Sequence, residues 1–136
     1  SNPHSAIGRG MKVGKEEICA LLCAVELFFE MDEAAVVAEW ERRCRVVAEA
    51  VADVEGIEVR FTKAYENKFP PASPLVHLHF SDAAPVPAGD VVRQLEAGEP
   101  SILAGGGSTS LSVGPQTLLD GEAEIIAARL KEIFAS

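Results

Sequence analysis

The sequence predicts an α+β fold, in which a small antiparallel sheet has helices packed on one face and is preceded by a long helix. Two observations support this prediction. Apolar residues recur with helical spacing over the first half of the chain, and from Ile57 onward they alternate with polar residues, as in strands with one buried face. Because such half-buried strands need a second layer to cover them, we expect the helices to form that layer.

The first predicted helix starts at Lys15 and is the most apolar part of the chain. Its main face follows the i, i+3, i+4, i+7 pattern, and small residues make its other faces apolar too. The main face consists of Ile18, Leu21, Leu22, Val25, Phe28 and Phe29. We therefore expect a helix that is buried on more than one side and acts as the spine of the fold.

A second helix is predicted from about Glu33 to Val54. Asp32 can cap its first turn, Trp40 and Cys44 belong to its apolar stripe, and Gly56 is expected to end it.

The remaining elements alternate between strands and helices. Strands are predicted over residues 57–62 and 75–80, followed by a helix over 88–97. Two short strands at 102–104 and 110–113 flank Gly105, Gly106 and Gly107, which are expected to form a turn. A last helix is predicted to start near Asp120.

The charge distribution limits the classes of ligand. The 136-residue chain has 12 basic and 21 acidic residues and a net charge of -9, yet Arg9, Lys12 and Lys15 all precede the first acid. This acidity argues against a general nucleic-acid surface, although a tRNA substrate stays open. The longest apolar run, 18–29, is shorter than the roughly 20 residues of a membrane span, and we expect a cytoplasmic protein that does not bind membranes.

The cysteines and histidines offer two candidate metal sites, neither of which is complete. Cys19 and Cys23 are four residues apart on one helix, but buried packing of all three cysteines, including Cys44, is the favoured interpretation. His77 and His79 share one face of a strand without a further ligand nearby, so their role stays open. The sequence assigns no metal site and no catalytic residue to this chain.

The segment IGRGMKVGKEE, residues 7–17, is the best candidate for anion binding. Its glycines allow close approach of the backbone, and Arg9, Lys12 and Lys15 bring positive charge just before a helix N-terminus. A basic arm that contacts nothing would have the same composition, and the residues alone do not decide between these two interpretations.

This segment resembles the stretch that joins the large and small domains in pyridoxal-phosphate (PLP) enzymes similar to selenocysteine synthase, a group that includes D-glucosaminate-6-phosphate ammonia lyases. The resemblance runs over residues 3–18 and continues in the tail with Glu99, Pro100, Ser101 and Ile102 and with the acidic helix start at Gly121. The middle of the chain resembles that family only in its order of elements.

The resemblance implies the C-terminal domain of the aspartate-aminotransferase (type I PLP) fold, with residues 1–14 as an interdomain segment and 15–136 as the small domain. It implies that PLP is bound by an upstream large domain that is missing here, so that this piece alone is not catalytic. Four residues are then expected to contact a small-molecule substrate near the active-site mouth, namely His4, Arg9, Lys12 and Lys15.

The same resemblance implies a homo-oligomer, a dimer or larger, with transferase or lyase activity on an amino acid, an amino sugar acid phosphate or a seryl-tRNA-like substrate. Relatives commonly carry an arginine on the strand after the Pro-x-Ile element, but residues 102–105 contain none.

The alternative to a domain of a PLP enzyme is a stand-alone ligand-binding or regulatory α+β module.

Overall fold

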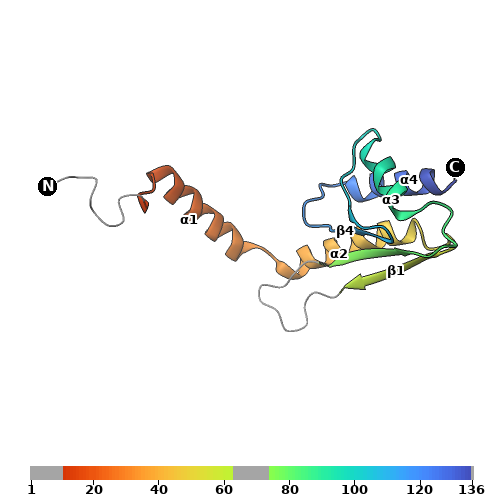
Figure 1. The fold of residues 1–136 in the computed structure, drawn as a ribbon. Coiled ribbons are helices and arrows are strands. Elements are labelled where there is room, and N and C mark those ends of the chain that lie inside the picture. Colours follow the sequence, from red (N-terminus) through yellow and green to blue (C-terminus); the bar gives the residue numbers. More distant parts are fainter. Residues whose placement is uncertain (1–10, 63–73, 136) are drawn as a thin grey trace, which may run out of the picture. The chain divides into compact units, whose positions relative to one another are not determined.

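The computed structural model describes residues 11–62 and 74–135, and by their contacts they form two units, residues 1–33 and 34–136. The first unit has one described helix, α1 (Lys15–Glu30). The second contains α2 (Glu33–Glu49) apart from its first residue, together with β1 (Ile57–Thr62), β2 (Leu75–Phe80), α3 (Ala88–Glu96), β3 (Gly105–Gly106), β4 (Ser110–Val113) and α4 (Glu122–Ala135) (Figure 1). The α+β prediction is confirmed.

The four strands form one antiparallel sheet in the order β1-β2-β4-β3. Its buried face carries Val76 and Leu78 of β2 and Leu111 and Val113 of β4, which pack with apolar residues of α2, α3 and α4. Burial of this cluster supplies the main driving force for folding of the second unit. Helices thus cover one face of the sheet, as the alternation of apolar and polar residues predicts.

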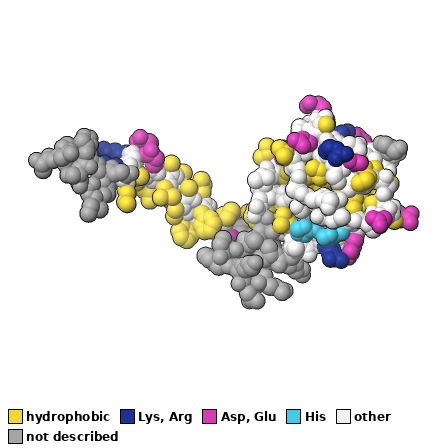
Figure 2. Space-filling view, in the orientation of Figure 1, with side chains coloured by type: hydrophobic (Ala, Val, Ile, Leu, Met, Phe, Trp, Pro, Cys, Tyr) yellow, Lys and Arg dark blue, Asp and Glu magenta, His cyan; other side chains and the backbone are white. Residues whose placement is uncertain are grey.

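The opposite face of the sheet is polar. The cross-strand register places Glu58 beside His79, and Arg60 beside His77. Ser112 of β4 lies on the other side of His77. In Figure 2 the histidine side chains lie at the surface of this unit, next to basic and acidic groups.

The expectation that the first helix is a buried spine is wrong for the described structure, because no residue of α1 is buried. Its apolar side chains are exposed, from Val25 at 42% to Phe29 at 80%. The physical reason is that α1 is the one described helix of its unit, and a single helix cannot cover its own apolar face. A helical period predicts which residues share a face, but not whether anything covers that face.

The second helix ends earlier than predicted, at Glu49 rather than near Val54. From Val51 the backbone forms tighter turns, with hydrogen bonds from Val51 N–H to Ala48 O and from Val54 N–H to Val51 O. Gly56 follows with a φ of 79° and lies against the backbone of Ala84, so it serves the turn into β1 rather than a helix end.

The triple glycine is also arranged differently from the prediction. Gly105 and Gly106 form β3 itself, and no strand is found over residues 102–104. A Cβ on Gly106 would lie 2.7 Å from the carbonyl oxygen of Ser110, so the absence of a side chain permits close pairing with β4. The last helix starts at Glu122, two residues later than predicted.

Candidate functional site

A cavity of about 440 Å³ opens at the end of the sheet where β3 and β4 separate. Their register pairs Gly106 with Leu111 and Gly105 with Ser112. Beyond the Gly105–Ser112 pair, the chain before β3 and the chain after β4 both line the cavity. The cavity is lined by residues 100–105, by 112–114 and 116–118, and by Glu122, Ile125 and Ile126 of α4.

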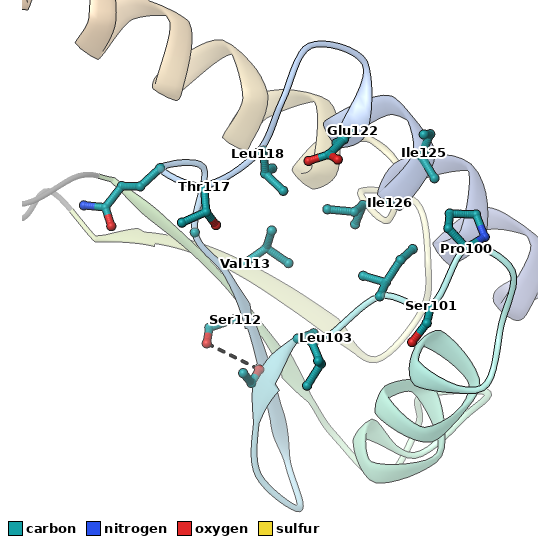
Figure 3. Close-up of a pocket in the computed structure, with 15 residues that line it drawn as sticks. Pro100, Ser101, Leu103, Ser112, Val113, Thr117, Leu118, Glu122, Ile125 and Ile126 are labelled. Carbon is teal, nitrogen blue, oxygen red and sulfur yellow. Dashed lines mark hydrogen bonds between the residues drawn. The ribbon is translucent and has the colours of Figure 1, made fainter.

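The cavity has a mixed lining, in which apolar side chains from β4 and α4 and from residues 102–104 and 118 lie beside polar side chains and backbone. Val113 and Ile126 are buried, and Ile102 and Leu118 are half-buried beside the core. Figure 3 shows the side chains of Val113, Leu118 and Ile126 directed toward a common space. At the rim, Leu103 is 88% exposed, so apolar surface continues out of the cavity.

Five lining residues have polar side chains, and hydrogen bonds within the chain account for three of them, whereas Gln116 and Thr117 have no partner among the described residues. Ser101 Oγ donates to Glu96 O at 2.7 Å, and Ser112 Oγ donates to Gly105 O over a long 3.4 Å. Glu122 Oε2 accepts a hydrogen bond from the backbone N–H of Leu119 at 2.8 Å. Among the described residues that line the cavity, Glu122 carries the one charge.

The wall at residues 116–118 is held in place from α2 by Arg43, whose side chain is only 11% exposed. Its Nη1 donates to Leu118 O, and its Nη2 donates to Asp120 Oδ1 at 2.9 Å. Its Nε donates to Glu39 Oε1 at 2.8 Å, so α2 orients the guanidinium as well.

Arg42 adds a second connection between α2 and α4. It donates through Nε to Glu39 at 2.8 Å and through Nη1 to Glu124 at 2.7 Å. Hydrogen bonds from Arg42, which have the larger effect, and from Arg43 lower the pKa of Glu39 to about 2. The pKa of Glu124 is likewise lowered, chiefly by its hydrogen bond from Arg42. Both carboxylates therefore belong to a structural network.

A second, more open hollow of about 490 Å³ lies at the end of β1 and β2. It is lined by Gly56, Ile57, Glu58, Arg60, His79, Phe80 and Ser81. Arg60 donates to Glu58 at 2.9 and 2.8 Å, which neutralises both charges. The centroids of the His77 and His79 rings lie 6.4 Å apart, and no group of three metal-ligating side chains occurs in the described part of the chain.

Of the residues predicted to bind substrate, His4 and Arg9 lie outside the described residues. Lys12 and Lys15 belong to the first unit and are exposed, whereas every residue that lines either hollow belongs to the second unit. Their assignment as substrate ligands therefore stays a prediction.

The cysteines divide into two groups. Cys44 is buried, as predicted, but Cys19 and Cys23 are exposed on α1, so the prediction of buried packing is wrong for these two. Both are exposed because α1 is the one described helix of its unit, so no other described element packs against it there.

Sequence reasoning missed the cavity and the position of Glu122. The sequence indicates only that the last helix has an acidic start after Gly121. A carboxylate three residues after Leu119, just where a helix begins, is the spacing of a side chain that reaches back to cap free N–H groups. That spacing predicts the capping bond, but the cavity depends on where β3 and β4 separate.

The described helices include none that is long and apolar enough to cross a membrane.

No protein-family model matches the chain. The chain is similar to the D-glucosaminate-6-phosphate ammonia lyase of Salmonella typhimurium, with 28% identity over 134 residues. It is a distant relative of that enzyme. The similarity covers 96% of this chain but 34% of the lyase, so the chain spans about one third of its relative's length.

Proposed function

We propose that this chain is the C-terminal small domain of a PLP-dependent transferase or lyase with the aspartate-aminotransferase fold. The observation that supports this proposal is the extent of the similarity to the ammonia lyase. Since it covers 96% of the chain, it includes residues of both units, yet it covers only 34% of the lyase. High coverage of this chain together with low coverage of the lyase is expected if the chain corresponds to one domain of a larger enzyme.

In this proposal residues 1–14 are the interdomain segment and residues 15–136 the small domain. The whole enzyme is a cytoplasmic homo-oligomer of the selenocysteine synthase-like group. Its substrate is an amino acid, an amino sugar acid phosphate or a seryl-tRNA-like molecule. The name of the Salmonella relative favours the amino sugar acid phosphate among these.

The described residues do not fit a PLP site. Such a site needs a lysine that can form a Schiff base, together with groups that hold the phosphate. Neither hollow of the second unit is lined by a lysine, and the described lysines, Lys12, Lys15 and Lys131, are exposed at the surface. We therefore assign the cofactor to an upstream domain and no catalytic step to this chain.

The role left for this chain is to help bind the substrate. We propose that Arg9, Lys12, Lys15 and His4 bind a phosphate or carboxylate of the substrate near the active-site mouth. Arg9 and Lys12 precede α1 in the sequence and Lys15 is its first residue, so the proposal rests on these three positive charges. The start of the helix adds little to them, because Glu16 and Glu17 already supply negative charge to the first turn of α1.

Reduction of the chain with borohydride in the presence of PLP tests the assignment of the cofactor. Mass spectrometry should find no lysine that is modified preferentially, because exposed lysines form only weak, scattered aldimines. Modification of one lysine in a 1:1 ratio, protected by an amino-acid substrate, would show that this chain holds the cofactor itself.

The second candidate function is a stand-alone ligand-binding module, and the cavity beside α4 is the observation that favours it. A binding site that works without any upstream domain would support this function.

A further inference from the structure

We propose that the cavity between β3, β4 and α4 binds a small molecule with an apolar body and a hydroxyl or ammonium group, and that Glu122 excludes carboxylates and phosphates from it. This proposal does not depend on the PLP-enzyme assignment, because all the groups that it uses belong to the second unit.

The size and lining of the cavity define the ligand's body. A volume of about 440 Å³ lies in the range of small-molecule sites, roughly 300–1,000 Å³. The side chains of Val113, Leu118 and Ile126 converge on the same space (Figure 3). Contact with this surface removes apolar area of the ligand from water, so the ligand gains affinity from an apolar body.

The polar groups define the ligand's functional group. Glu122 uses Oε2 to cap Leu119, and its Oε1 has no hydrogen-bond partner among the described residues. The hydroxyl of Thr117, in the lining segment 116–118, also lacks a described partner. Oε1 is only an acceptor, so it binds a ligand that donates through a hydroxyl or an ammonium group.

The same carboxylate accounts for the exclusion of anions. The N-terminus of α4 would otherwise attract a negatively charged ligand. Here Glu122 already supplies negative charge to that first turn, the charge of Glu124 is paired with Arg42, and the described lining includes no lysine or arginine. A bound carboxylate would therefore meet the charge of Glu122 without a compensating cation.

Three matched ligands test the proposal: phenethylamine, 2-phenylethanol and 3-phenylpropionate. They share a phenyl-alkyl body and carry a positive, a neutral and a negative end. Titration into the ¹⁵N-labelled chain, followed by NMR, should give the tightest binding for phenethylamine and the weakest for 3-phenylpropionate. The shifted amide signals should belong to residues 102–105, 112–118 and 122–126.

The variant Glu122→Gln should reverse this order. Glutamine keeps an acceptor oxygen for Leu119 N–H but removes the charge. Phenethylamine should bind at least about tenfold more weakly, as expected for loss of a charge-assisted hydrogen bond, and 3-phenylpropionate should bind more tightly. Glu124→Gln is the matched control, because Glu124 lies on the same turn but outside the cavity lining, and it should leave the order unchanged.

Ile125→Trp tests the location separately and does not alter the capping bond. Ile125 lies at the partly exposed rim, so a tryptophan there should block the cavity and weaken all three ligands. The proposal is overturned if 3-phenylpropionate binds the wild-type chain as tightly as phenethylamine. It is also overturned if Glu122→Gln folds but leaves the order unchanged, or if Ile125→Trp binds all three ligands normally.

Discussion

The Nη2 atom of Arg43 lies 2.9 Å from Oδ1 of Asp120, although these residues are 77 positions apart in the sequence. The same guanidinium donates to the carbonyl oxygen of Leu118. One side chain of α2 thus holds the loop that forms a wall of the cavity and leads into α4. The shape of the cavity consequently depends on a residue that does not line it.

Replacement of Arg43 by alanine should destabilise the second unit by about 1–3 kcal/mol, because it leaves the Leu118 carbonyl without its charged donor and breaks the bond to Asp120, whereas Glu39 keeps its bonds from Arg42. Urea unfolding measures this difference. Arg45→Ala is the control, since Arg45 makes an exposed 3.7 Å ion pair with Glu41 and should change the free energy of unfolding by less than about 0.5 kcal/mol. Equal effects of the two substitutions would contradict the role given to Arg43.

The low pKa of Glu39 predicts how stability depends on pH. Hydrogen bonds from Arg42 and Arg43 lower this pKa from 4.5 to about 2 in the folded chain, so the folded state prefers the ionised form. The resulting stabilisation is complete above pH 4.5 and is lost as the pH falls from 4.5 toward 2. Urea unfolding of the wild type and of Glu39→Gln should therefore differ most near neutral pH and converge in acid. A difference independent of pH would contradict the prediction.

Two leucine substitutions compare α1 with the core. Leu130 of α4 is fully buried, so Leu130→Ala should cost about 2–5 kcal/mol in denaturant unfolding. Leu22 of α1 is 59% exposed, and Leu22→Ala should cost less than about 1 kcal/mol because little buried surface is lost. Similar costs for both would show that α1 is covered in solution, as the sequence alone predicts.

Thiol reactivity provides an independent check that α1 is exposed whereas the core of the second unit is buried. Cys19 and Cys23 are exposed, whereas Cys44 is buried, and burial raises the pKa of the Cys44 thiol. An aromatic disulfide reagent should modify two thiols rapidly under native conditions and the third only after unfolding. Cys44→Ser should leave the fast phase unchanged, and a fast phase of one thiol or of three would refute the assigned exposures.

Much of the second unit could be predicted from the sequence because its elements carry a strong local period. The alternation of Ile57, Val59 and Phe61 predicts β1, and the same alternation separates Val76 and Leu78 from His77 and His79. The strand at Gly105–Gly106 has no such period, since glycine carries no side chain to alternate. Only the close approach to Ser110 in the folded chain explains that strand.

The candidate site could be predicted only in part. Glu122 belongs to a recognisable capping pattern, but the cavity arises from contacts between segments that are far apart in sequence, such as Arg43 and Leu118. The exposure of α1 had no sequence signal either, because an apolar face looks the same whether it packs in a core or against another domain.

The central claim is that this chain is the small domain of a larger PLP-dependent enzyme, and the reading frame of its gene tests that claim most directly. If the chain is such a domain, the open frame should continue upstream of Ser1 and encode a large domain with a Schiff-base lysine. A start codon immediately before Ser1, with a folded and abundant protein of this length in the cell, would contradict it.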